Sequence, residues 1–334
     1  IVALSFKDYL KYVPVKALAG LTKTNILGLD LSKLTGDGQF EALTPAQLNL
    51  LAKQTATDAT TIAQVGDITT AQIEALTPAQ AKGLTKDFIA LLNDEQVAHL
   101  QPATLAAITP TAFSGFTSAA LVATLSTKGL TADNAPAITA AQLATLTADK
   151  IGALSDTATS GFQYLSPSSL VGLTKLNITG SGTAGDDYLD TALMTADQIA
   201  ALSAAQVQLF NAAQVTGLTT SNPDAISAAV ISALSSTQVA AMTADSAQTK
   251  ALQPAAFAGF TAKNIGGLTD GGATSNAISF ITAEQAAYLS ADAIKGLAST
   301  QVDGATTTAF TSDAFAAIQP NSFKAMSTAT FKSA

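Results

Sequence analysis

Apolar and polar residues alternate with a period of eight in residues 68–123, which divide into seven consecutive blocks without an insertion. The first position of each block is apolar and the sixth usually is, whereas Thr is common at the second position and Gln at the fifth. Proline is accepted at the third position, as in the block LTPAQAKG that begins at Leu76. The pattern predicts one structural unit that is repeated along the chain.

The second to fifth positions of the block follow the sequence rules for the start of a helix. In the block at Leu76, Thr77 is placed as the N-cap, Pro78 as the first helical residue, and Gln80 as the third, whose side chain can reach back to the cap. The apolar first and sixth positions are then the pair that forms a hydrophobic staple. Both rules predict the same short helix, which begins after Thr77.

A single long helix or strand does not fit this spacing. In a continuous helix the apolar stripe would rotate by about 80° per block, and Pro78, Pro102 and Pro110 would each cost about 3 kcal/mol inside it. In a continuous strand the first and sixth positions would face opposite sides. A train of helices of one to two turns fits best. A solenoid of short strands broken by turns stays open as an alternative, although the Ala and Gln content favours helix.

The blocks must stack to be stable. Burial of two apolar side chains contributes about 3 to 6 kcal/mol per block, whereas ordering eight residues costs about 12 kcal/mol. Burial against neighbouring blocks must supply part of the difference, as in repeat proteins. The predicted fold class is therefore mainly α, a repeat solenoid of short helices, with a β-solenoid as the alternative.

Two regions are predicted along the chain. Residues 1–42 are more aromatic and carry several lysines, and we expect them to form an N-terminal capping region. Residues 43–334 are expected to form the octad-repeat solenoid, with inserts rich in Gly, Asp, Ser, Thr and Asn that predict loops. The inserts are residues 52–67, 124–137, 155–164, 179–193, 219–225, 243–251 and 270–280.

Composition narrows the possible partners. All 16 basic residues are Lys, and the net charge is −8, so a nucleic-acid partner is not expected and anionic membranes are disfavoured. The chain has no Cys, which excludes disulfides and thiolate metal sites. No apolar run approaches the roughly 18 residues of a transmembrane helix. Because the sequence starts at Ile1 without a signal peptide pattern, we expect a processed product or a segment of a longer protein.

Residues 180–190, GSGTAGDDYLD, contain the strongest candidate for a metal site. The portion GTAGDDYLD resembles one degenerate unit of the Gly- and Asp-rich calcium nonapeptide of proteins exported by type I secretion. This resemblance implies Asp186, Asp187 and Asp190 as candidate calcium ligands. The motif works through successive copies and the chain has one, so an ordinary polar loop is the alternative. No other cofactor is expected.

Catalytic signatures are absent from the sequence. His99 is the sole histidine, and the neighbouring Asp94 and Glu95 fall where acids favour a helix N-terminus, so all three are interpreted as structural. There is no GxSxG motif on a strand-turn-helix pattern, no phosphate-binding loop, no dinucleotide fingerprint and no HExxH. We therefore expect no catalytic and no cofactor-binding residues, and no enzymatic activity.

Two aromatic pairs occupy core positions of the block. Phe113 with Phe116, and Phe257 with Phe260, lie at sixth and first positions, which are apolar elsewhere, and a glycine between them allows close packing. We interpret both pairs as core. An aromatic platform for a ligand is the alternative.

Tandem blocks such as ITTAQIEALTPAQ, ITAAQLATL, MTADQIAALSAAQV and LSSTQVAAM resemble repeat regions of very large bacterial surface and secreted proteins, often adhesin-like or exported by type I systems. The resemblance implies an extracellular or cell-surface, non-enzymatic role. We expect a self-assembling subunit or segment of a surface layer, filament or adhesin stalk, whose partners are copies of itself. The alternative is an extracellular binding module that uses the inserts to recognise a cell-surface glycan, a protein or calcium.

Overall fold

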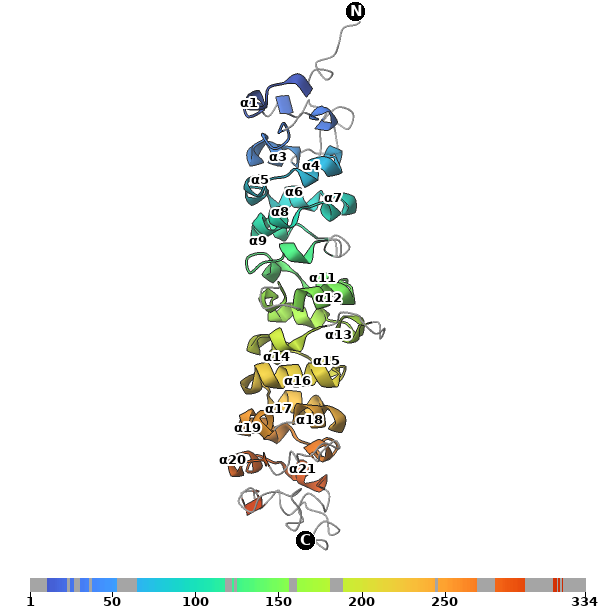
Figure 1. Cartoon of the computed structure of the whole chain (residues 1–334), viewed down its shortest axis with the longest axis vertical. Coiled ribbons are helices and arrows are strands. Elements are labelled where there is room, and N and C mark those ends of the chain that lie inside the picture. The colour runs from blue at the N-terminus through green and yellow to red at the C-terminus, as the bar shows by residue number, and fades with distance from the viewer. Residues whose placement is uncertain are drawn as a thin grey trace, which may run out of the picture. The chain divides into compact units, whose positions relative to one another are not determined.

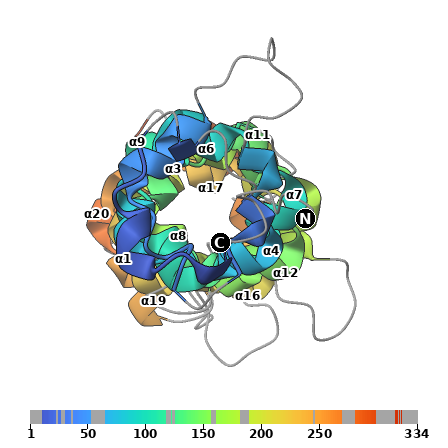
Figure 2. The ribbon, with the colours of Figure 1, turned by 90° about the horizontal axis from the view of Figure 1, so that it is seen from above.

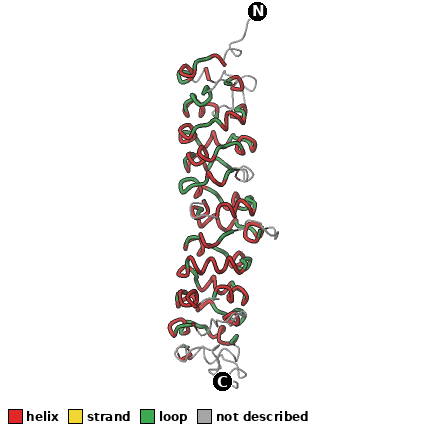
Figure 3. The backbone as a smooth tube through the Cα atoms, in the orientation of Figure 1, coloured by secondary structure: helices red, strands yellow, loops and turns green. Residues whose placement is uncertain are grey.

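Short helices make up the regular structure of this chain (Figure 3). The computed structural model describes residues 11–22, 25–26, 31–35, 38–52, 65–117, 122, 125–155, 161–180, 189–243, 246–268 and 280–297, with 315, 316, 318 and 320. These residues form α-helices and 3-10 helices, and there is no strand among them. The prediction of a mainly α fold is confirmed, and the β-solenoid alternative is wrong.

The chain divides into two compact units. The first comprises Ile1–Lys150 and Thr159–Gly172, and the second comprises Ile151–Ala158 and Leu173–Ala334. The sequence predicts a different division, between a capping region at 1–42 and repeats at 43–334. That division rests on composition and stays a prediction.

In the first unit, helices three blocks apart pack on one another (Figure 1). Helix α4 packs on α7, α5 on α8 and α6 on α9, and each partner begins 24 residues further along the chain. Viewed from above (Figure 2), α4 and α7 lie in the same sector, as do α3, α6 and α9. One coil of the chain therefore contains three blocks. The elements of this unit are α1 (Val15–Leu18), η2 (Leu31–Lys33), α3 (Pro45–Leu51), η4 (Val65–Asp67), α4 (Thr70–Glu74), α5 (Pro78–Lys82), α6 (Lys86–Ala90), α7 (Asp94–Ala98), α8 (Pro102–Ala107), α9 (Pro110–Phe113), η5 (Thr127–Gly129), η6 (Ala135–Ala137), α11 (Ala140–Leu143), η7 (Gly161–Tyr164) and η8 (Pro167–Gly172), with α12 (Ala148–Ser155) at the division.

The second unit has the same spacing. Helix α15 packs on α17, and α16 packs on α18, with starts 24 residues apart, and α18 in turn packs on η12. The elements are α13 (Lys175–Thr179), η9 (Thr191–Leu193), α14 (Ala196–Ala201), α15 (Ala204–Val207), α16 (Ala212–Ser221), η10 (Pro223–Ala225), α17 (Ala228–Ala233), α18 (Ser236–Met242), α19 (Ser246–Ala251), η11 (Pro254–Gly259), η12 (Ile265–Leu268), α20 (Ala283–Ala286) and α21 (Ala291–Lys295).

Helices begin where the sequence predicts. Thr77 is the N-cap of α5, and its Oγ1 accepts a hydrogen bond from the backbone N–H of Gln80 (3.2 Å). The N–H of Thr77 donates in return to Gln80 Oε1 (2.9 Å), and Pro78 is the first helical residue. This capping box satisfies two polar groups that a helix start otherwise leaves unpaired. The same reciprocal bonds occur at Thr44, Thr69, Asn93, Thr139, Thr174, Thr195, Ser203, Asn211, Ser235 and Thr282.

The glutamine at the fifth position does more than the capping rule predicts, because it also joins successive coils. Gln80 is only 3% exposed, and its Nε2 donates to the carbonyl oxygens of Phe40 (3.0 Å) and Leu43 (2.9 Å) in the previous coil. Its Oε1 accepts from Thr77, so both ends of the amide are satisfied. We call such buried side chains the ladder. Its glutamines are Gln47, Gln72, Gln80, Gln96, Gln142, Gln206, Gln214, Gln238 and Gln285, which reach carbonyls 25 to 41 residues earlier.

Other residues replace glutamine in parts of the ladder. Thr104 Oγ1 donates to the carbonyl oxygen of Leu76 (2.6 Å), and Lys150 Nζ donates to that of Leu125 (2.9 Å). Lys150 offers no acceptor, so it cannot complete the capping box as glutamine does. Its partial burial also lowers the pKa of the Lys150 ammonium from the ordinary 10.5.

Asn49 supplies the cap bond that helix α6 lacks, because the fifth position of the α6 block holds an apolar residue instead of glutamine. Phe88 stands there and cannot accept the N–H of Thr85, which donates instead to Asn49 Oδ1 in the previous coil (2.9 Å). Asn49 Nδ2 donates in turn to the carbonyl oxygen of Gly83 (2.9 Å). The cap N–H is therefore satisfied from a neighbouring coil instead of from its own helix.

The core consists of the first and sixth positions. Leu76, Ile89 and Leu105 are each at most 4% exposed. Both phenylalanine pairs are buried, with edge-to-face rings whose centroids lie 5.0 Å apart in the pair at Phe113 and 5.2 Å apart in the pair at Phe257. The interpretation of these pairs as core is confirmed.

Six of the seven predicted loop inserts contain helical elements among their described residues. Inserts 52–67, 155–164, 179–193 and 243–251 contain η4, η7, η9 and α19, respectively. Two further inserts are largely helical and belong to the coils. Residues 124–137 contain η5 and η6, which pack on α8 and α9, and residues 219–225 contain the end of α16 and all of η10. The loop prediction is wrong there because a degenerate block was missed. Asn134 acts as the ladder residue, since its Oδ1 accepts from the N–H of Thr131 (2.8 Å) and its Nδ2 donates to the carbonyl oxygen of Leu105 (3.1 Å).

Candidate functional site

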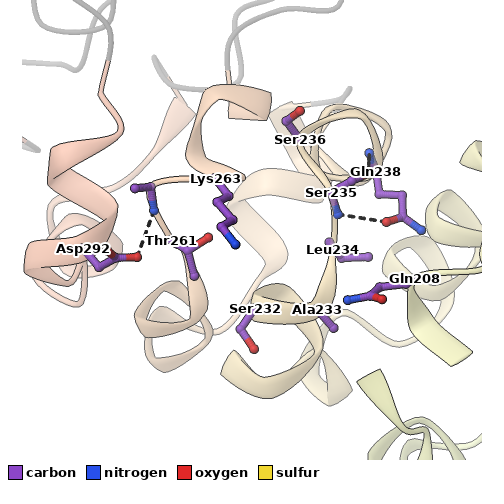
Figure 4. Close-up of a pocket in the computed structure, with 11 residues that line it drawn as sticks. Gln208, Ser232, Ala233, Leu234, Ser235, Ser236, Gln238, Thr261, Lys263 and Asp292 are labelled. Carbon is purple, nitrogen blue, oxygen red and sulfur yellow. Dashed lines mark hydrogen bonds between the residues drawn. The ribbon is translucent and has the colours of Figure 1, made fainter. Parts of the chain in front are cut away.

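A groove with a volume of about 730 Å³, lined by both polar and apolar residues, lies on the second unit (Figure 4). Four segments form it: the C-terminal end of α15, the corner between α17 and α18, the turn before η12, and the start of α21. They belong to successive coils, so the groove extends along the stacking direction. The lining residues are Gln208, Ser232, Ala233, Leu234, Ser235, Ser236, Gln238, Thr261, Ala262, Lys263 and Asp292.

The ladder holds the floor of the groove in place. Ser235 is the N-cap of α18, and its N–H donates to Gln238 Oε1 (2.9 Å). The Nε2 of Gln238 donates to the carbonyl oxygens of Val207 (3.0 Å) and Phe210 (2.8 Å). Backbone segments from two coils are thus fixed on each other by one buried amide.

The turn that carries Lys263 is held from both sides. Asn264 Nδ2 donates to the carbonyl oxygens of Ile231 (2.8 Å) and Leu234 (3.2 Å) in the coil before it. The N–H of Ala262 donates to a carboxylate oxygen of Asp292 (3.0 Å) in the coil after it. In Figure 4 the exposed Lys263 side chain extends over the space between this turn and the segment that carries Ser235.

A second hollow of about 430 Å³ adjoins the groove and shares Ser236, Ala262 and Lys263 with it. Gly267 and Gly296 line this hollow. A Cβ atom on Gly267 would lie 2.8 Å from Val239 Cβ, and one on Gly296 would lie 2.5 Å from a backbone oxygen of Ala262. These glycines therefore allow the coils to approach closely beside Lys263.

Only one of the three predicted calcium ligands lies within the described residues. Asp186 and Asp187 lie outside them. Asp190 is the N-cap of η9, and its Oδ1 accepts from the N–H of Ala192 (2.8 Å). Within the described ranges, no three His, Asp or Glu side chains gather as a metal site would require. The calcium site stays a prediction.

His99 lies on the surface as the C-cap of α7. Its Nδ1 lies 2.8 Å from the carbonyl oxygen of Glu95, and its Nε2 lies 3.8 Å from Glu74 Oε1 in the previous coil. A pair this exposed contributes little to stability. The contacts agree with the structural interpretation of His99.

Sequence reasoning missed the groove. Lys263 and Asp292 both occupy the fourth position of a block, and Gln208 and Ser232 both occupy the seventh. These positions read as solvated surface in a single block. They become neighbours only when the coil is known to contain three blocks, which the octad pattern alone does not specify.

Within the described residues, no helix is long and apolar enough to cross a membrane. No family model, no curated protein and no solved structure matches this chain.

Proposed function

We propose that this chain is a repeat solenoid that acts as a non-enzymatic structural protein of the bacterial cell surface or extracellular space. In this role it would be a self-assembling subunit or segment of a surface layer, filament or adhesin stalk. The supporting observation is the ladder, in which buried amides such as Gln80 in the first unit and Gln238 in the second join a coil to the previous one. Buried hydrogen bonds between coils resist separation of the coils, which suits a structural protein.

The mode of packing also supports association of copies. Within each unit, coils contact one another through buried apolar side chains and through polar side chains that donate to backbone carbonyls of the previous coil. A contact that repeats along one chain is of the head-to-tail kind, and contacts of that kind grow into open assemblies when they do not close into a ring.

Electron microscopy of the purified chain over a range of concentrations tests the assembly. Ordered fibres or sheets are expected, together with a mean mass from light scattering that rises with concentration. Dispersed monomers at every concentration would overturn the proposal. Protease treatment of intact producing cells tests the location, because a surface protein is degraded while a cytoplasmic marker survives.

A further inference from the structure

Three polar groups around the groove have no partner among the described residues: the Lys263 ammonium, the Gln208 side-chain amide and the Ser236 hydroxyl. They come from three segments of the second unit that the ladder fixes relative to one another. Figure 4 shows Lys263 and Gln208 approaching the space from opposite sides. The groove thus offers three unpartnered polar side chains on segments that are fixed relative to one another, and its volume of about 730 Å³ lies in the range of small-molecule sites, about 300 to 1,000 Å³.

The charged residues of the groove indicate which charge a ligand would carry. Lys263 and Asp292 are the only charged residues that line the groove. One oxygen of Asp292 already accepts from the N–H of Ala262, which leaves the other oxygen as an acceptor. A single ammonium can pair with a single carboxylate. The larger negative charge of a phosphate or a polyanion would be repelled more strongly by Asp292 and by the net charge of −8.

The remaining lining favours a ligand rich in hydroxyl groups. Amide and hydroxyl side chains donate and accept hydrogen bonds, as sugar hydroxyls do. The adjoining hollow of about 430 Å³ continues past Lys263, so a ligand longer than one ring can extend along it. We propose that this groove binds an acidic oligosaccharide, with a uronate carboxylate on Lys263 and sugar hydroxyls on Gln208, Ser236 and Asp292.

Calorimetric titration of the full chain with a trisaccharide that carries a single glucuronate beside two glucose residues tests this site. The neutral trisaccharide of glucose is the matched ligand, and we expect it to bind about tenfold more weakly because it lacks the charge-assisted bond to Lys263. Added salt should weaken the glucuronate complex more than the glucose complex. No binding of glucuronate, or equal binding of the two sugars, would overturn the proposal.

Substitutions then locate the binding. Lys263→Gln should weaken glucuronate binding about tenfold, whereas the control Lys295→Gln, an exposed lysine of α21 outside the groove, should leave it unchanged. Circular dichroism should show both variants folded, since neither lysine is buried. Equal affinities of the two variants would place any binding elsewhere and refute the site. Triglutamate serves as a peptide probe, and binding as tight as that of glucuronate would also refute it.

Discussion

The regular run of the first unit, residues 68–117, and the groove region of the second, residues 228–268, are built on the same bonds but present different surfaces. Gln80 and Gln238 each accept from an N-cap N–H and donate to two carbonyls of the previous coil. The first region contains α-helices α4 to α9, whereas the second includes the 3-10 helices η11 and η12. In both regions, the residue at the fifth position of the block therefore joins successive coils. We call this set of bonds the frame.

The surface positions differ between these regions. At the fourth position, the first region carries Ala79 where the second carries Lys263, and at the seventh it carries Lys82 where the second carries Ser232. Such changes leave the ladder intact because these side chains point away from it. The comparison teaches that the frame and the surface can vary independently, which substitutions in matched positions can test.

The largest effect is expected when a ladder amide becomes a carboxylate. Gln80→Glu and Gln238→Glu each place a buried acceptor against two carbonyl oxygens, so we expect a loss of about 3 to 5 kcal/mol in the free energy of unfolding. Burial raises the pKa of the new carboxyl group, so the loss should shrink as the pH falls and that group is protonated. Urea unfolding measures both variants.

The exposed Gln101, which makes no cap bond, provides the control for this change. Gln101→Glu should leave the free energy of unfolding within about 0.5 kcal/mol. If Gln80→Glu and Gln238→Glu behaved like this control, the ladder would not hold the coils. If only one of them lost stability, the two regions would not share a frame.

A smaller loss is expected where two coils approach through glycine. A Cβ on Gly115 would overlap the backbone oxygen of Lys86, and one on Gly267 would overlap the backbone oxygen of Ser236. Gly115→Ala and Gly267→Ala should each cost about 1 to 3 kcal/mol, because the backbone opposite each glycine cannot move freely. Gly266 has no atom within 4 Å of such a Cβ, and Gly266→Ala is the neutral control in thermal unfolding.

Loss of a cap hydroxyl is expected to cost less again. Thr77→Ala in the first region and Ser235→Ala in the second each remove one capping bond, so we expect a loss of about 0.5 to 2 kcal/mol. Thr77→Ser and Ser235→Thr should keep the stability of the natural chain, since either hydroxyl caps a helix. If the alanine variants unfolded at the same urea concentration as the natural chain, the ladder amides alone would define the helix starts.

The sequence predicted local structure better than it predicted the site. Thr77, Pro78 and Gln80 lie within one helical turn, so rules on helix starts place them correctly. The bonds from Gln80 to Phe40 and Leu43 join residues 40 and 37 positions apart, and no local rule specifies that distance. The groove depends on the same long separation, because Ala262 and Asp292 are 30 positions apart.

The smallest effect should be a gain, at the ladder position that lysine occupies. Lys150 donates to the carbonyl oxygen of Leu125 but has no acceptor atom, whereas Gln80 donates to two carbonyls and also accepts from its cap. Lys150→Gln supplies the missing acceptor near the N–H of Thr147, so we expect a gain of about 0.5 to 1.5 kcal/mol in the free energy of unfolding.

The pH dependence of stability separates this gain from a general effect of removing charge. Burial lowers the pKa of Lys150 in the folded chain, so between the folded and the unfolded pKa the unfolded chain binds more protons and stability rises with pH. Lys150→Gln should abolish that rise as well as add stability at neutral pH. Lys128→Gln, at an exposed lysine without a ladder bond, should change neither. A Lys150→Gln variant that is less stable than the natural chain would show that the ammonium is the better partner for the Leu125 carbonyl, and that the ladder tolerates a charge because the charge strengthens its bond.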